Sequence, residues 1–114
     1  MEDCIFCKIA RHEIASKVVY EDDEIMAFRD VNPVAPTHIL AIPKRHIPGI
    51  MSLTEEDMGL IGNIMLTIRK LAQETSIAED GFRVVVNHGA RAGQSVPHLH
   101  FHLLGGRGMT WPPG

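Results

Sequence analysis

The sequence predicts an α+β domain in which a mainly antiparallel sheet of five strands is covered on one face by one long helix. Five short apolar or β-branched runs bounded by turn residues predict the strands. One long segment with helical periodicity predicts the covering helix. At 114 residues the chain has the size of one compact domain. We therefore expect a single domain over residues 1–114, with 105–114 as a C-terminal tail.

The first predicted elements are a short helix and a β-hairpin. Apolar residues between Ile5 and Ile9 fall at helical spacing. Residues 18–20 and 25–28 are apolar runs separated by the acidic turn EDDE, which favours a hairpin. The run HILAI, residues 38–42, lies between two prolines and is predicted to be a central strand, because proline can end a strand without removing a ladder donor.

The long helix is predicted from Thr54 onward. Thr54 is a capping residue and acidic residues fill the first turn. The apolar positions follow i, i+3, i+4, i+7 spacing and are Ile61, Ile64, Met65, Ile68, Leu71 and Ala72. Residues 82–87 and 97–104 are the last two predicted strands.

Composition and charge exclude several classes of partner. The formal charge is -3, from 11 basic and 14 acidic residues mixed along the chain, so no basic stripe is available for a nucleic acid. No run approaches the ~20 apolar residues of a membrane span. The N-terminus lacks the pattern of a secretory signal, which favours the cytoplasm. In that compartment Cys4-x-x-Cys7 indicates a metal or redox feature more than a disulfide.

The most unusual stretch is PHLHFHLL near the C-terminus, where histidines and apolar residues alternate: His98, His100 and His102 with Leu99, Phe101 and Leu103. On a strand, alternate side chains share a face. The apolar set is expected to pack under the long helix and the histidines to lie on the open face. The alternation thus separates a packing face from a working face.

Three interpretations of this row are open from the residues alone. The histidines could be polar residues of a solvated strand, ligands of a metal, or catalytic groups. The preceding loop NHGARAGQS supplies glycine N–H groups together with Asn87, Gln94 and Ser95, all suited to phosphate oxygens. Imidazoles beside an anion-binding loop favour phosphoryl chemistry.

The motif His-x-His-x-His-x-x with apolar x resembles the signature of the histidine triad (HIT) family. The segment GQSVPHLHFHLLGGRGMTWPPG is similar to its Hint branch of nucleoside phosphoramidases. The segments CIFCKI, YEDDEIMAFRDVNPVAPTHILAIPKRHI and VVVNHGARAGQS follow the family's order and spacing, so that the resemblance covers nearly the whole chain.

The resemblance implies roles for the triad and the phosphate loop. His100 would be the nucleophile that attacks the α-phosphorus and forms a nucleotidyl-imidazole. His102 would lie near the phosphate oxygens, and His38 would help to orient the triad. The phosphate clamp would comprise Asn87, Gly93, Gln94, Ser95 and Val96, with no magnesium required.

The resemblance also implies a nucleoside site for a purine nucleotide. Asp30 would accept the ribose hydroxyls. The base pocket would be apolar and consist of Ile5, Phe6, Ile9, Phe28 and Val31. Each of these five residues could equally be ordinary core packing.

Bacterial members of the family keep a CxxC that binds zinc with two histidines. Here the resemblance implies Cys4, Cys7, His46 and His98 as ligands of a structural zinc, which is closed because no position is left for water. The alternative is a reduced Cys pair that only fills space beside the first helix. If zinc binds His98, the first histidine of the row serves the metal site, and its neighbours His100 and His102 face the phosphorus.

The resemblance further implies a homodimer that pairs through the long helix and a strand, with Trp111 of the tail reaching the partner's active site. The expected activity is hydrolysis of the P–N bond of nucleoside 5'-phosphoramidates. Two alternatives remain: hydrolysis of dinucleoside polyphosphates, as in another branch of the family, and a zinc-stabilised scaffold that binds nucleotides without acting through catalysis.

Overall fold

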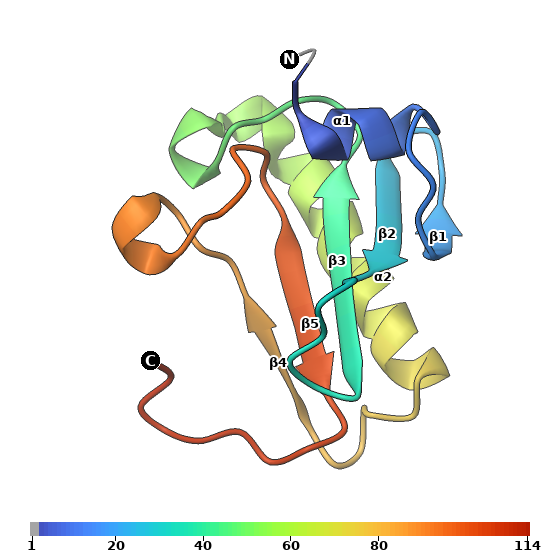
Figure 1. Ribbon diagram of the computed structural model, residues 1–114, viewed down its shortest axis with the longest axis vertical. Helices are drawn as coiled ribbons and strands as arrows, with labels where there is room; N and C mark the ends of the chain where they lie inside the picture. The colour runs from blue at the N-terminus through green and yellow to red at the C-terminus, as the bar shows by residue number, and fades with distance from the viewer. Residues whose placement is uncertain (1–2) are drawn as a thin grey trace.

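A computed structural model describes residues 3–114, which form an antiparallel five-stranded sheet in the order β1-β2-β3-β5-β4 (Figure 1). The helices are α1 (Ile5–Ala10) and α2 (Met58–Glu74), and the strands are β1 (Val18–Glu21), β2 (Ile25–Arg29), β3 (Thr37–Pro43), β4 (Phe82–Val85) and β5 (Phe101–Gly105). Three short 3-10 helices span Ile50–Ser52, Glu55–Asp57 and Ala90–Ala92. All four strand pairings are antiparallel. The predicted fold class is therefore confirmed.

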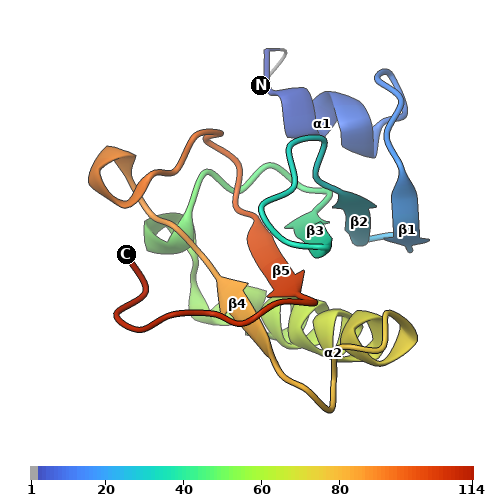
Figure 2. The ribbon, with the colours of Figure 1, turned by 60° about the horizontal axis from the view of Figure 1, so that its bottom comes forward.

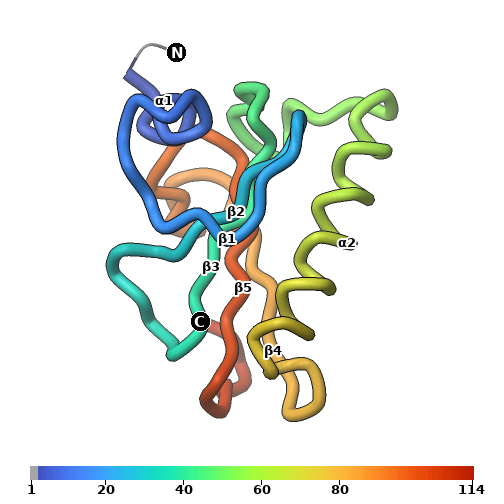
Figure 3. The backbone as a smooth tube through the Cα atoms, turned by 90° about the vertical axis from the view of Figure 1, so that its right-hand side faces the viewer, coloured from blue at the N-terminus to red at the C-terminus, as the bar shows by residue number. Residues whose placement is uncertain are grey.

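The two helices lie on opposite faces of the sheet, as Figure 3 shows. The larger core cluster joins α2 to one face and includes Ile39, Ala41 and Ile68. The smaller cluster joins α1 to the other face and includes Leu40 and Ile42. Strand β3 is buried along its whole length, as expected for a continuous apolar run at the centre of a sheet covered on both faces.

Helix α2 follows the predicted pattern with one exception. Thr54 and Asp57 form a reciprocal capping box before the helix begins. Ile64, Ile68 and Leu71 are buried against the sheet. Met65 was predicted to share this face but its side chain is 43% exposed, because it follows Ile64 by about 100° around the helix and leaves the stripe that the sheet covers.

The last strand is shorter than predicted. Strand β5 begins at Phe101 and not at Pro97, and its last pairing with β3 is Ala41↔Phe101. Two residues further along β3 stands Pro43, which has no N–H to donate to a longer ladder. The backbone before Phe101 pairs instead with the segment that follows β3. There the Leu99 N–H donates to Ile47 O at 2.6 Å. Strand β4 likewise ends at Val85, two residues before the predicted end.

The predicted alternation of faces nevertheless extends through this segment. Leu99, Phe101 and Leu103 belong to the core cluster under α2. The histidines take the opposite side, but that side is not open as predicted: His98 is 0% and His100 4% exposed. Phe6 of α1 covers both rings, with centroids 5.9 and 5.1 Å away.

The tail beyond β5 has no regular structure and passes the β4 edge of the sheet (Figure 2). Two arginines hold it, because Arg83 donates to Thr110 O and Arg107 donates to Val34 O, both at 2.9 Å. Trp111 is 82% exposed, so most of its side-chain surface is left uncovered by the described residues. Among the described residues, no helix has both the length and the apolar character needed to cross a membrane.

Candidate functional site

The Cys/His cluster lies where α1 meets the end of β3 and the segment before β5. The donor atoms of Cys4, Cys7, His46 and His98 all lie within 4.8 Å of one another. The His98 Nδ1 atom is 3.3 Å from Cys4 Sγ and 3.5 Å from Cys7 Sγ, and His46 Nδ1 is 3.2 Å from Cys7 Sγ. The structure thus brings together all four predicted metal ligands.

The spacing of these atoms fits a tetrahedral metal. Zinc–sulfur bonds of about 2.3 Å and zinc–nitrogen bonds of about 2.0–2.1 Å at tetrahedral angles place sulfur and nitrogen about 3.6 Å apart. The observed separations of 3.2–3.5 Å are close to that value. The His98 ring is also correctly turned: its Nε2–H donates to Pro43 O at 2.8 Å, because a carbonyl can only accept. The Nδ1 lone pair is left facing the sulfurs.

His100 is held in the opposite tautomer by the backbone two residues before it. Its Nδ1 lies 2.7 Å from the carbonyl oxygen of His98, so Nδ1 carries the proton and donates it. The Nε2 lone pair is left without a partner among the described residues. Since none of their fully buried side-chain nitrogens or oxygens lacks a partner, Nε2 is accessible from the adjacent cavity. A neutral imidazole with one free, accessible nitrogen is suited to nucleophilic attack.

His102 and His38 form a hydrogen-bonded relay whose direction is fixed. The Val34 N–H donates to His38 Nδ1 at 3.1 Å, so the proton of neutral His38 is on Nε2. That Nε2–H donates to His102 Nδ1 at 2.9 Å, with Asp30 Oδ2 at 3.4 Å as a second acceptor. His102 Nδ1 is therefore an acceptor, and its own proton is on Nε2.

Burial keeps this relay neutral. Desolvation, with the charges of His100 and His38 adding to it, lowers the pKa of His102 to about 4. Desolvation also lowers the pKa of His38, against the opposing effect of Asp30. Although Asp30, His38 and His102 lie close enough to form a metal cluster, the Val34 N–H occupies His38 Nδ1 and the proton occupies Nε2. His38 thus has no nitrogen free for a metal, and the relay is suited to proton positioning.

A cavity of about 270 Å³ opens beside His100 and His102. Its walls contain ten residues predicted from the sequence: Ile5, Phe6, Ile9, Phe28, Asp30, Val31, Ser95, Val96, His100 and His102. Five others were not predicted: Ile14, Ala15, Ser16, Arg29 and Leu40. Arg29 and Leu40 lie in the segment that resembles the family, but only the position of Arg29 next to Asp30 could have indicated a place in the cavity, and Ile14, Ala15 and Ser16 lie outside every motif.

Four predicted nucleotide-binding residues do not line this cavity: Asn87, Gly93, Gln94 and Trp111. The Gln94 side chain instead orders the loop, since its Nε2 donates to Pro48 O and Val96 O while its Oε1 accepts from the Gly89 N–H. Gly93 adopts a φ of 90° that disfavours other residues. These contacts shape the loop that carries Ser95 to the cavity wall.

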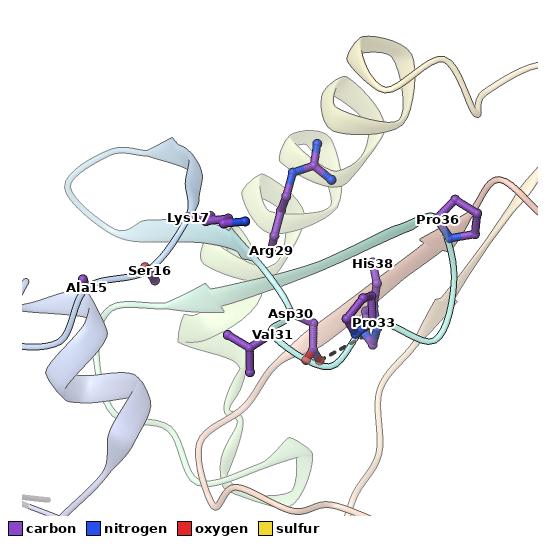
Figure 4. A pocket seen from close by; sticks show the side chains of 9 residues that line it. All are labelled: Ala15, Ser16, Lys17, Arg29, Asp30, Val31, Pro33, Pro36 and His38. Atoms are coloured by element: carbon purple, nitrogen blue, oxygen red, sulfur yellow. Dashed lines mark ion pairs between the residues drawn. The ribbon is translucent and has the colours of Figure 1, made fainter.

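A second, larger pocket of about 680 Å³ shares part of its wall with the cavity, and Figure 4 shows the residues that line it. Five residues line both hollows: Ala15, Ser16, Arg29, Asp30 and Val31. The larger pocket contains neither His100 nor His102, and its lining includes Lys17, Pro36 and His38.

Known proteins resemble the chain over nearly its whole length. The HIT domain family model matches residues 11–109. A 14 kDa zinc-binding protein of Zea mays is 49% identical over 96% of this chain and 87% of its own length. The crystal structure of a HIT family hydrolase from Legionella pneumophila superposes with a TM-score of 0.97 and 53% identity, covering 98% of this chain and 100% of that one.

A further solved structure, of a histidine triad protein from Clostridium difficile, superposes with a TM-score of 0.93 and 46% identity over 96% of each chain. The family model, these relatives and the arrangement of the three alternating histidines agree. The chain belongs to the HIT domain family.

Proposed function

We propose that this protein hydrolyses the P–N bond of nucleoside 5'-phosphoramidates, with a preference for purines. The observation that carries the proposal is the state of His100: its Nδ1–H is bound to the His98 carbonyl and its Nε2 is free beside a cavity. The Legionella pneumophila relative, described as a hydrolase, supports the general reaction class.

In the proposed reaction, the Nε2 lone pair of His100 attacks the α-phosphorus. The P–N bond breaks, and the amine leaves with the bonding electron pair and takes up a proton from solvent, which the water of the second step later replaces. The intermediate is a nucleotide bound to an imidazolium, whose Nδ1–H still donates to the His98 carbonyl. Water then attacks the phosphorus, releases the nucleotide and restores neutral His100.

His102 and Ser95 would stabilise the charge that develops on the phosphate oxygens. The relay from Val34 through His38 leaves His102 with an Nε2–H to donate. Because the pKa of His102 is lowered to about 4, it acts near neutral pH as a neutral N–H donor. Asn87 and the backbone from Gly93 to Val96 would complete the clamp, and magnesium is not required.

Asp30 would accept the ribose hydroxyls. Its Oδ1 already accepts the Asn32 N–H at 2.8 Å, which orients the carboxylate. The base would lie against the apolar wall of the cavity, formed by Ile5, Phe6, Ile9, Phe28 and Val31.

Zinc is proposed as a structural cofactor at Cys4, Cys7, His46 and His98. The donor set and its spacing support the assignment, as does the zinc-binding relative from Zea mays. Bound zinc would link the N-terminal helix to the sheet, and all four positions would be filled by protein. Its role is therefore separate from the attack on phosphorus.

A homodimer is proposed through α2 and the edge strand β4. Strand β4 ends the sheet order and has one side unpaired within the chain. Met65 and Leu66 of α2 and Phe82 of β4 are 43%, 63% and 40% exposed. Pairing of two copies at this edge would cover these apolar side chains and place each tail beside the partner.

The test is release of AMP from adenosine 5'-phosphoramidate by wild type, His100→Ala and the control His12→Gln. His12 is exposed, and its Nε2 lies 2.8 Å from Glu21 Oε2 at the surface. We expect His100→Ala to lower kcat by at least about 10³-fold and the control to retain full activity. Brief chelation should leave the rate unchanged.

Three results would contradict the proposal. Persistent P–N hydrolysis in His100→Ala would refute the nucleophile. Faster cleavage of diadenosine tetraphosphate than of the phosphoramidate would assign the protein to the dinucleoside polyphosphate reaction. A cellular phenotype that survives His100→Ala would indicate a scaffold role.

A further inference from the structure

The larger pocket beside Asp30 contains two basic side chains, Lys17 and Arg29. They are neighbours across the β1–β2 hairpin, since the Arg29 N–H donates to the Lys17 carbonyl at 3.0 Å just beyond the Val18↔Phe28 pair. Figure 4 shows Lys17 directed toward the base of Arg29, whose guanidinium extends away from Asp30. Like charges at cross-strand positions repel each other.

Neither of these cations has an acidic partner within ion-pair distance among the described residues. Three lysines and arginines do, since Arg11 pairs with Glu13, Lys44 with Glu21 and Arg45 with Asp57, and what distinguishes Lys17 and Arg29 from the remaining unpaired ones is that both line one pocket. Lys17 and Arg29 therefore form an uncompensated positive pair at the rim of a pocket of about 680 Å³, within the size range of ligand sites. Such a pair is suited to an anion with several oxygens, above all a phosphate.

The position of the pocket beside Asp30 indicates which part of a nucleotide would carry that phosphate. If Asp30 accepts the ribose hydroxyls from the triad cavity, those hydroxyls lie at the border that both hollows share. A substituent on the 2'- or 3'-oxygen would leave the cavity there and enter the larger pocket. The Asp30 carboxylate is itself engaged by the Asn32 N–H and lies 3.4 Å from His38 Nε2, which lowers its repulsion of a nearby anion.

We propose that the Lys17–Arg29 pocket binds a phosphate carried on the ribose 2'- or 3'-oxygen, so that the substrates include nucleoside 5'-phosphoramidates with a second phosphate on the ribose. The inference rests on the proposed function for the position of the ribose. Lys17 is the principal contact because it lines the pocket, whereas the Arg29 guanidinium extends away from Asp30. Arg29 is exposed and must turn its long side chain to reach the same phosphate.

The test compares the binding of AMP, adenosine 3',5'-bisphosphate and adenosine 2',5'-bisphosphate to the full chain by calorimetry at low salt. We expect at least one bisphosphate to bind about fivefold more tightly than AMP, and the gain to shrink as salt is added. Lys17→Gln should abolish the gain without changing the affinity for AMP, and Arg29→Gln should reduce it. Arg69→Gln, on α2 and outside the pocket lining, is the matched control.

Equal affinity for AMP and both bisphosphates would overturn the inference. A gain that persists in Lys17→Gln would also overturn it, because the added phosphate would then bind elsewhere. The proposed function fails separately: a protein that binds AMP but does not cleave adenosine 5'-phosphoramidate refutes the phosphoramidase, while the affinity ratio still decides the pocket. Failure to bind any of the three nucleotides would overturn both.

Discussion

Two histidines only two residues apart, His98 and His100, have opposite surroundings. His98 is completely buried in a cluster whose four donor atoms face one another. His100 is nearly as buried, but its ring borders a cavity. The donor atoms around His98 enclose a position inside the protein, whereas the ring of His100 faces a cavity.

The difference arises from which of the two ring nitrogens donates to a backbone carbonyl. The Pro43 carbonyl accepts from His98 Nε2–H and leaves Nδ1 free, whereas the His98 carbonyl accepts from His100 Nδ1–H and leaves Nε2 free. His102 accepts at Nδ1 from His38 and keeps a proton on Nε2. Three alternating histidines of one segment therefore present a free Nδ1 facing the sulfurs, a free Nε2 facing the cavity and an Nε2–H donor, although the three side chains are chemically identical.

The largest expected effect is on the closed cluster. Cys4→Ser preserves the volume of the side chain but removes a thiolate ligand. We expect zinc, measured by elemental analysis, to fall from about one per chain to well below one, and the free energy of unfolding to fall by several kcal/mol. At temperatures where the variant is still folded, P–N hydrolysis should stay within about tenfold of wild type, because zinc is not part of the attack.

The matched control for this experiment is His12→Gln, which alters an exposed histidine outside the cluster. Wild type that binds far less than one zinc, together with unchanged thermal stability of Cys4→Ser, would show that the cysteines only fill space. If Cys4→Ser lost catalysis as severely as stability, the Cys/His cluster and the His100 site would not have separate roles.

The second prediction concerns the pH dependence of stability. The pKa of His102 is lowered to about 4 in the folded chain from an ordinary 6.5, so the unfolded chain binds the proton more readily between these values. The stabilisation is complete above about pH 6.5 and is lost as the pH falls toward 4, by at most about 3 kcal/mol. His38, His100 and Asp30 are the titratable groups that face His102.

Urea unfolding at pH 7.5 and 4.5, with chelator present throughout, measures this effect without a contribution from zinc release. We expect the free energy of unfolding to fall less with pH in His102→Gln than in wild type. Parallel pH profiles for the two proteins would show that burial does not depress the pKa of His102 as the structure indicates.

The sequence predicted which side chains share a face more successfully than it predicted where the strand begins. Alternation depends only on extended backbone, and the apolar set from Leu99 to Leu103 packs under α2 as expected. The strand start depends on the partner across the sheet, and Pro43 limits that ladder. The covered state of the histidine face was also missed, because it depends on where the six-residue helix α1 docks.

The cavity shows the same limit. Residues within motifs were found, including His100, His102 and Asp30. Ile14, Ala15 and Ser16 were missed, since they belong to the connection between α1 and β1 and acquire their position only when the chain folds back over the cavity. Patterns of period 2 or 3.6 carry no information about such connections.

The third prediction tests the relay that sets His102 apart from His98. His38→Phe keeps an aromatic ring but removes the Nε2–H that donates to His102 Nδ1. We expect kcat for P–N hydrolysis to fall by about 10–100-fold, with a smaller change in KM, because the tautomer of His102 is no longer fixed. A change confined to KM would indicate that His38 serves only nucleotide binding. His12→Gln is again the control.

The smallest effect is expected from the tail, which lies outside both histidine environments. Trp111 is 82% exposed and does not line the cavity of its own chain, and Figure 1 shows the tail ending beyond the β4 edge where the proposed partner would lie. Removal of residues 111–114 should change the relative rates for phosphoramidates with different amines by about threefold to tenfold, measured as kcat/KM. The affinity for AMP should be unchanged, since the cavity proposed to bind the nucleoside is lined by α1, β2, the connection between α1 and β1, and the loop before β5. An unaltered ranking of amines would mean that the tail does not reach the leaving group, and would remove one argument for the dimer at this edge.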